Sequence, residues 1–105
     1  MKRLNKQRTA IVTKVVFSQT ARDNLVDQAL YIYEQTQSTK LSDKYLDDMK
    51  NYIITMLSKF PKSGRPATDL AVDTRKLVYQ GYSIIYRITN KQAEVLTLYK
   101  ENLPK

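Results

Sequence analysis

The stretch from Phe60 to Tyr99 constrains the fold of this chain more than any other part of the sequence. It opens with a turn, PKSGRP, and continues with three short runs of Val, Ile, Leu and Tyr. The pairs Gln80-Gly81 and Asn90-Lys91 separate these runs. Short β-branched and aromatic runs bounded by turn residues are typical of consecutive antiparallel strands. The sequence therefore predicts three hairpin-connected strands in the second half of the chain.

Two amphipathic segments precede these strands. Thr20 followed by Asp23 is an acidic variant of the capping box and predicts the start of a first helix. The polar residues 35–39 interrupt the helical pattern, and Pro61 ends the second segment. We therefore expect a helical hairpin that buries its apolar faces against the sheet, because the chain offers no other surface. The apolar positions at helical spacing are Ala21, Leu25, Ala29, Ile32 and Tyr33 in the first segment, and Leu41, Tyr45, Met49, Tyr52, Ile53, Met56, Leu57 and Phe60 in the second.

A further strand is predicted from Ala10 to Phe17, because this stretch is apolar and β-branched. Residues 1–9 are polar, basic and without periodicity, and we expect a mobile basic arm there. The expected fold is α+β with the order β-α-α-β-β-β, an antiparallel sheet and an N-terminal helical hairpin packed on one face. At 105 residues, the chain is expected to form a single domain spanning residues 1–105.

Alternation along the predicted strands gives the sheet two different faces, one to pack on the helices and one to present basic or aromatic residues. One set of positions is Arg75, Leu77 and Tyr79, then Tyr82, Ile84, Tyr86 and Ile88, then Ala93, Val95, Thr97 and Tyr99. The opposite set is Lys76 and Val78, then Ser83, Ile85 and Arg87, then Glu94, Leu96, Leu98 and Lys100.

Composition excludes several kinds of chemistry. The chain has no cysteine and no histidine, which removes thiol nucleophiles, disulfides, thiolate zinc sites and the commonest general base. We expect no metal ion and no cofactor. Eighteen Lys and Arg against ten Asp and Glu give a net charge of +8, which suits a polyanion or an acidic partner protein. No apolar run approaches the ~18–20 residues of a membrane span, and a cytoplasmic protein is expected.

The order of these elements, with the phrases inside them, resembles the RelE/ParE superfamily of toxins from bacterial type II toxin–antitoxin modules. VVFSQTARDNL at Val15–Leu25 is similar to the strand and helix start of family members, which have an alanine followed two positions later by an acidic residue. FPKSGRP at Phe60–Pro66 matches the proline, glycine and arginine that follow the second helix. DTRKLVYQGYSIIYRI at Asp73–Ile88 and AEVLTLY at Ala93–Tyr99 match the last three strands. The resemblance covers about residues 14–100 and favours the ParE-like branch.

The superfamily implies two activities. RelE-like members cut messenger RNA in the ribosomal A site, whereas ParE-like members inhibit DNA gyrase. Many members end the last strand in a basic phrase, but this chain continues as Tyr99-Lys100-Glu101-Asn102, which puts a nuclease set in doubt. The resemblance therefore implies a gyrase inhibitor rather than an RNase, in a hetero-oligomer with a cognate antitoxin whose acidic C-terminal segment wraps it. The alternatives are a RelE-like, ribosome-dependent mRNA endonuclease and a non-toxic nucleic-acid-binding module.

Six residues are candidates for the functional surface. A partner-binding surface would use Arg65, Arg75, Lys76, Arg87, Tyr99 and Lys100. In an RNase, Arg65, Arg75, Arg87 and Lys100 would stabilise charge on the phosphate, and Tyr99 or Tyr86 would act as the acid or stack on a base. The general base would have to be Glu94, Glu101, or a lysine or tyrosine with a depressed pKa.

Each candidate also has a structural interpretation. Arg65 could be a solvated turn residue, Arg75 and Lys76 could guard a sheet edge, and Arg87 could be a paired structural cation. Pro61 and Gly64 are expected to set turn geometry rather than to perform chemistry.

Overall fold

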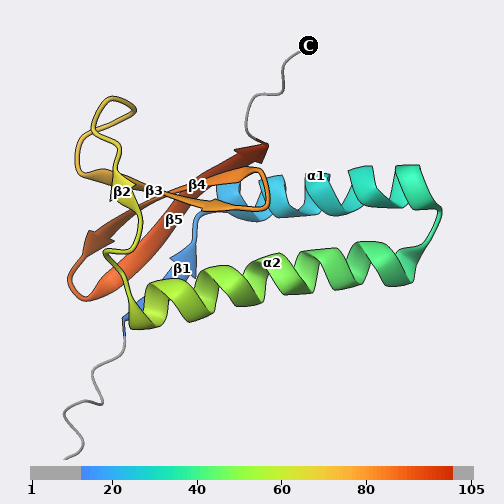
Figure 1. Ribbon diagram of the computed structural model, residues 1–105, viewed down its shortest axis with the longest axis horizontal. Coiled ribbons are helices and arrows are strands. Elements are labelled where there is room, and N and C mark those ends of the chain that lie inside the picture. The colour runs from blue at the N-terminus through green and yellow to red at the C-terminus, as the bar shows by residue number, and fades with distance from the viewer. Residues whose placement is uncertain (1–12, 101–105) are drawn as a thin grey trace, which may run out of the picture.

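In the computed structural model residues 13–100 are described, so the expected arm at 1–9 and the first part of the expected strand, residues 10–12, lie outside them. The elements are β1 (Lys14–Phe17), α1 (Gln19–Thr36), α2 (Thr39–Lys59), β2 (Arg65–Pro66), β3 (Thr74–Tyr79), β4 (Tyr82–Thr89) and β5 (Gln92–Lys100). The two helices form an antiparallel hairpin whose closed end projects beyond the sheet (Figure 1). Among the helices of this range, neither is long and apolar enough to cross a membrane.

The sheet has five strands in the order β1-β5-β4-β3-β2. The two predicted hairpins are confirmed, because Tyr79 pairs with Tyr82 and Thr89 pairs with Gln92 across two-residue turns. All four turn residues have positive φ angles, as the hairpin turns that match strand twist require.

Two details of the sheet differ from the expected all-antiparallel arrangement. β1 lies parallel to β5, which makes the sheet mixed, and the two-residue β2 adds an edge strand beside β3. Side-chain alternation has the same period in either strand direction, so it does not encode whether a neighbour is parallel. The α+β class and the helical hairpin packed on the sheet are as expected.

Helix α1 begins directly after Ser18, and not at Thr20 as the capping-box pattern predicts. The Ser18 Oγ accepts a hydrogen bond from the Ala21 N–H at 3.0 Å, and the residue has extended backbone angles. The same hydroxyl donates to the Leu96 carbonyl oxygen at 2.8 Å, and the Ser18 N–H donates to the Val95 carbonyl oxygen at 2.9 Å. Strand β5 therefore fixes where α1 starts.

The core lies between the helices and the sheet, and its largest fully buried side chains include Tyr86, Met49 and Ile53. The predicted helix faces are correct at their centres and wrong at their ends. Tyr33, Leu41 and Phe60 are exposed, because the first two lie toward the projecting end of the hairpin and the third lies past the end of α2.

Strand β5 departs from strict alternation. Ile85 pairs with Thr97 and Tyr86 pairs with Val95, which leaves Leu96 as an extra residue in a β-bulge. As a result Leu98 is buried in the core beside Val95, although alternation assigns it to the opposite face. Tyr99 correspondingly turns to the face of the sheet that points away from the helices, which we call the outer face.

Candidate functional surface

The turn between α2 and β2 is held by side chains from β3 and β4. The fully buried Tyr86 donates its hydroxyl proton to the Pro61 carbonyl oxygen at 2.6 Å and accepts a hydrogen bond from the Gly64 N–H at 2.9 Å. Arg75 Nη1 donates to the carbonyl oxygens of Gly64 at 2.5 Å and Lys62 at 3.3 Å. Arg75 therefore stabilises this turn rather than guarding a sheet edge.

Only glycine fits at the centre of this turn. A Cβ on Gly64 would lie 2.7 Å from the Tyr86 ring and 2.8 Å from the Lys76 carbonyl oxygen. The FPKSGRP phrase thus has a structural role, as expected for Pro61 and Gly64. The turn also fixes the position of the next residue, the candidate Arg65.

Four of the six candidate residues lie on the outer face. Arg65 and Lys76 are directly paired neighbours on β2 and β3. Arg87 lies on β4, where its Nε donates to Glu94 Oε1 at 3.3 Å, so it is the paired cation that the structural interpretation describes. Tyr99 lies near the end of β5 opposite Ser83, and 39% of its surface is exposed.

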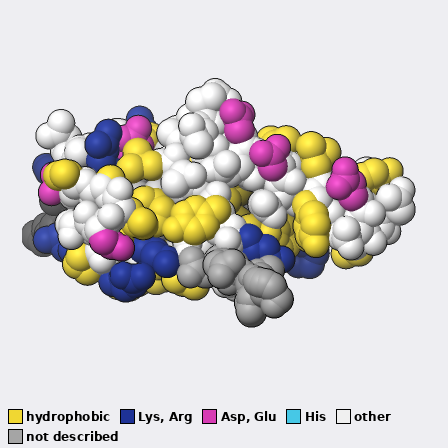
Figure 2. All heavy atoms as spheres, turned by 90° about the horizontal axis from the view of Figure 1, so that it is seen from above, with side chains coloured by type: hydrophobic (Ala, Val, Ile, Leu, Met, Phe, Trp, Pro, Cys, Tyr) yellow, Lys and Arg dark blue, Asp and Glu magenta, His cyan; other side chains and the backbone are white. Residues whose placement is uncertain are grey.

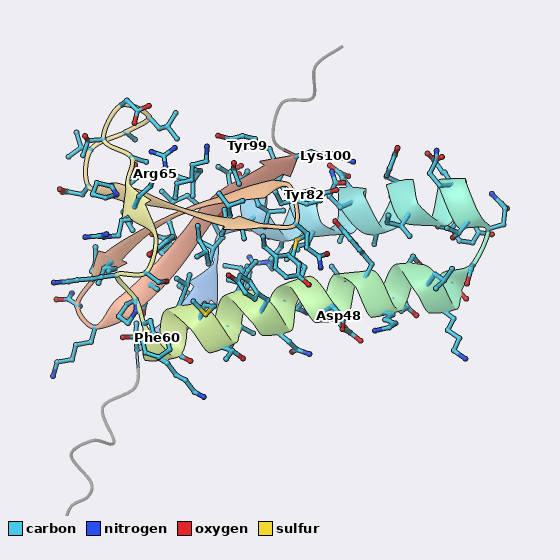
Figure 3. All side chains as sticks on the ribbon, in the orientation of Figure 1. Asp48, Phe60, Arg65, Tyr82, Tyr99 and Lys100 are labelled. Carbon is cyan, nitrogen blue, oxygen red and sulfur yellow. The ribbon has the colours of Figure 1, made fainter. Side chains whose placement is uncertain are left out.

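The other two candidates lie elsewhere. Arg75 shares the face of β3 with the buried Leu77, which is the face turned toward the helices. Lys100 pairs with Tyr82, and its Nζ lies 5.7 Å from the centre of the Tyr31 ring on α1. Figure 3 shows Tyr99 and Lys100 together at the end of β5, and Arg65 on the edge strand β2. The structure therefore divides the predicted set between two faces.

The outer face offers cations and an aromatic ring, but the described residues do not place a poised general base beside them. Glu94 is engaged by Arg87, and Glu101 lies outside the described residues. Burial raises the pKa of Tyr86, against the opposing effect of the Gly64 N–H, and its hydroxyl already bonds to two backbone groups. Within residues 13–100, no three Asp or Glu side chains gather in a way that could hold a metal ion.

A second surface is a hollow between β1 and the two helices, which we call the hairpin groove. Its volume is about 430 Å³, and a neighbouring hollow of about 310 Å³ continues it toward the closed end of the hairpin. Val26 and Leu46 line both hollows. The remaining lining of the hairpin groove is Val15, Val16, Phe17, Arg22, Leu25 and Lys50.

The sequence analysis did not identify the residues of this groove. The available signal was the apolar pair Val26 and Leu30, which has helical spacing but lies beside the predicted core face of α1. Val26 is 53% exposed and Leu30 is 55% exposed, so the two form an apolar patch on one face of α1.

Comparison with known proteins agrees with this fold. The family model described as the ParE toxin of the type II toxin–antitoxin system parDE matches residues 15–101. A chain from the chromosomal ParDE toxin–antitoxin system of P. aeruginosa superposes with a TM-score of 0.72 at 14% identity, covering 86% of this chain and 97% of the other. A chain from the RelBE2 toxin–antitoxin complex of Mycobacterium tuberculosis superposes with a TM-score of 0.66 at 21% identity, covering 87% and 93%. No curated protein matches.

The architecture, a helical hairpin on a mixed five-stranded sheet, is the fold of the ParDE and RelBE2 chains. Because the family model spans most of the sequence, the chain belongs to the ParE toxin family of type II toxin–antitoxin systems.

Proposed function

We propose that this toxin arrests growth by poisoning DNA gyrase, and that its outer face contacts the target. The observation that carries the proposal is the chemistry of that face. Arg65 and Tyr99 are exposed there, whereas Glu94, which lies on the same face of β5, is engaged in an ion pair with Arg87. Trapping a protein–DNA complex requires a basic and aromatic surface but no internal acid–base catalysis.

The surface charge supports the same proposal. Residues 60–100 carry seven Lys and Arg against three Asp and Glu, whereas residues 18–59 carry five against six. Figure 2 shows basic side chains with a few acidic ones at the sheet end, and further acidic side chains spaced along the helical hairpin. The toxin would therefore approach a DNA-bearing target with its sheet end foremost, because the potential of clustered cations steers association with a polyanion.

Cleavage of mRNA is the alternative that the superfamily allows. It would need a group that removes the proton of the ribose 2′-hydroxyl, beside cations that stabilise the phosphate. The neighbouring cations Arg65 and Lys76 meet the second requirement. The base is the missing element among the described residues, and this favours the gyrase proposal.

We further propose that the hairpin groove receives a segment of a cognate antitoxin. The groove is apolar and about 430 Å³ in volume, and Arg22 and Lys50 are its charged lining residues. An amphipathic helix that carries acidic residues beside its apolar face would fit this surface, because its carboxylates would meet the two cations. The groove and the outer face lie on different parts of the molecule, so neutralisation and toxicity would use separate residues.

The target is tested by supercoiling of relaxed plasmid with purified gyrase. Wild-type toxin is expected to inhibit supercoiling and to accumulate cleaved DNA, and the double variant Arg65→Ala/Tyr99→Ala is expected to lose most of this effect. Lys40→Ala, which removes an exposed cation at the start of α2, is the matched control and should behave as wild type. Unaffected supercoiling with wild-type toxin would reject gyrase as the target.

The same preparations should be added to translating ribosomes. Site-specific cleavage of mRNA by the wild-type toxin, with gyrase unaffected, would establish the RelE-like alternative. Binding to nucleic acid without either effect would instead support a non-toxic nucleic-acid-binding module.

A further inference from the structure

The loop between β2 and β3, residues 67–73, presents aliphatic side chains to solvent. Val72 is 77% exposed and Leu70 is 51% exposed. The charged residues of the loop are Asp69 and Asp73, so this segment is both apolar and acidic in a chain whose net charge is +8. Such a segment is adapted to a partner surface that is apolar and basic.

The loop is ordered by its own hydrogen bonds. Thr74 Oγ1 is within hydrogen-bonding distance of the Ala67 carbonyl oxygen at 2.8 Å and the Ala71 carbonyl oxygen at 2.9 Å. The Ala67 N–H donates to the Thr74 carbonyl oxygen at 2.9 Å, and the Leu70 N–H donates to the Ala67 carbonyl oxygen at 2.9 Å. Because the backbone is already fixed, docking the exposed side chains would cost little additional ordering.

The hairpin groove is apolar and basic, and so complements the apolar and acidic loop. It is lined by Val and Leu side chains and by Phe17, and its charged lining residues are Arg22 and Lys50. The neighbouring hollow carries Asp43 instead, so the complementary charge is confined to the end of the groove beside β1. An apolar loop with two carboxylates therefore matches this end of the groove in both hydrophobicity and charge.

A loop cannot reach the groove of its own chain. The groove is formed at β1, whereas the loop joins β2 to β3 at the opposite edge of the sheet. Four strand spacings separate the two edges, which is roughly 19 Å. Figure 1 shows the loop and β1 well apart, on different sides of the sheet.

We propose that the loop at residues 67–73 of one copy docks into the hairpin groove of a second copy. Leu70 and Val72 enter the apolar floor, and Asp69 and Asp73 face Arg22 and Lys50. The contact joins two different patches, so it is a head-to-tail contact. If the groove also binds the antitoxin, which rests on the proposed function above, self-association and neutralisation exclude each other.

The test is sedimentation of the purified full chain over a range of concentrations from micromolar to millimolar. The average mass is expected to rise with concentration, and Leu70→Ser/Val72→Ser should shift the association midpoint at least about ten-fold higher, since two exposed side chains lose their apolar contact. These positions are exposed, so the circular dichroism spectrum should not change. A chain that stays monomeric at every concentration would overturn the proposal and leave the loop to bind a different partner.

A charge swap tests the contact itself. Asp69→Lys and Lys50→Glu should each weaken association about three- to ten-fold, and the double variant should recover most of the loss, because opposite charges again face each other. Asp27→Lys combined with Lys50→Glu is the matched control, because Asp27 is exposed on α1 and is not among the residues that line the groove. Equal losses in the two double variants, without recovery, would show that the loop and the groove do not meet.

Discussion

At the residue scale, Gly64 shows how one turn residue is held by side chains from two other strands. Its N–H, its carbonyl oxygen and the space beside its Cα are all used by Tyr86 and Arg75. The FPKSGRP phrase could be recognised in the sequence, and its turn could be predicted. The buried tyrosine beneath it could not, because Tyr86 lies 22 positions away and its partner is a backbone group.

Replacing Gly64 with alanine should destabilise the fold by about 2–3 kcal/mol, because the new methyl group would overlap the Tyr86 ring and a backbone carbonyl. Gly81→Ala is the matched control: it has φ of 85° but nothing within 4 Å of the added Cβ, so it should cost only about 1 kcal/mol. Urea unfolding of the two variants measures the difference. Equal losses would contradict the close packing at Gly64.

Tyr45 should make stability depend on alkaline pH. Burial, with a hydrogen bond to Tyr82, raises the pKa of Tyr45 above its ordinary value of 10.0. The folded state therefore holds this proton more tightly than the unfolded state, so the stabilisation is complete below about pH 10 and declines as the pH rises above it. Urea unfolding between pH 8 and 11, as rough limits set by that ordinary pKa, should show a smaller decline for Tyr45→Phe than for wild type. If the free energy of unfolding fell equally with pH in both proteins, Tyr45 would not be the source of the decline.

At the element scale, α1 and β5 specify each other. Ser18 joins the start of α1 to β5, and further along the same strand Asn24 Oδ1 accepts hydrogen bonds from the Leu98 N–H at 3.0 Å and the Thr97 hydroxyl at 2.9 Å. These bonds cover the edge of β5 where β1 has ended. The polar side chains of α1 thus bond to the backbone groups at this edge of β5, which a longer β1 strand would otherwise pair.

Ser18→Ala should therefore lower the free energy of unfolding by about 1–2 kcal/mol, because both the helix cap and the bond to β5 are lost. Thr20→Ala should change it by less than about 0.5 kcal/mol, since Thr20 is an exposed residue inside the first turn. Thermal unfolding of the two variants distinguishes the observed cap from the one that local spacing predicts. A larger effect at Thr20 would contradict the observed start of α1.

The elements themselves could be predicted because their signals are local. The 3.6-residue spacing of Leu25 or Met49 and the turn pairs at 80–81 and 90–91 depend on near neighbours. The parallel contact of β1, the bulge at Leu96 and the added strand β2 depend on residues far apart in the sequence. For the same reason, the sequence named candidate residues but did not predict which face of the sheet each one lies on. The bulge moved Tyr99 to the outer face and placed Lys100 on the side of the helices.

At the scale of the whole molecule, the structure separates a sheet end with an excess of basic residues from an apolar groove on the helical hairpin. A toxin that must be both active and neutralised benefits from this division, because an antitoxin bound in the groove leaves the outer face chemically intact. The antitoxin would then neutralise the toxin by blocking access of the target to the outer face, or by holding the toxin in a complex.

The groove can be tested with two aliphatic positions of comparable exposure. Val26→Asp should weaken binding of the cognate antitoxin about thirty-fold or more, because it places a carboxylate in the apolar floor. Ile54→Asp, on α2 but not among the residues that line the groove, should leave the affinity within about three-fold of wild type. Calorimetric titration gives both values, and equal affinities of the two variants would place the antitoxin elsewhere.

The most direct test is the growth of cells in which the toxin is induced with and without its antitoxin. Wild-type toxin is expected to stop growth, and the antitoxin is expected to restore it. Arg65→Ala/Tyr99→Ala should be harmless yet still bind the antitoxin, whereas Val26→Asp should stop growth and resist rescue. Unimpaired growth with wild-type toxin, or loss of toxicity and of antitoxin binding together in both variants, would contradict a toxin whose outer face acts and whose hairpin groove is neutralised.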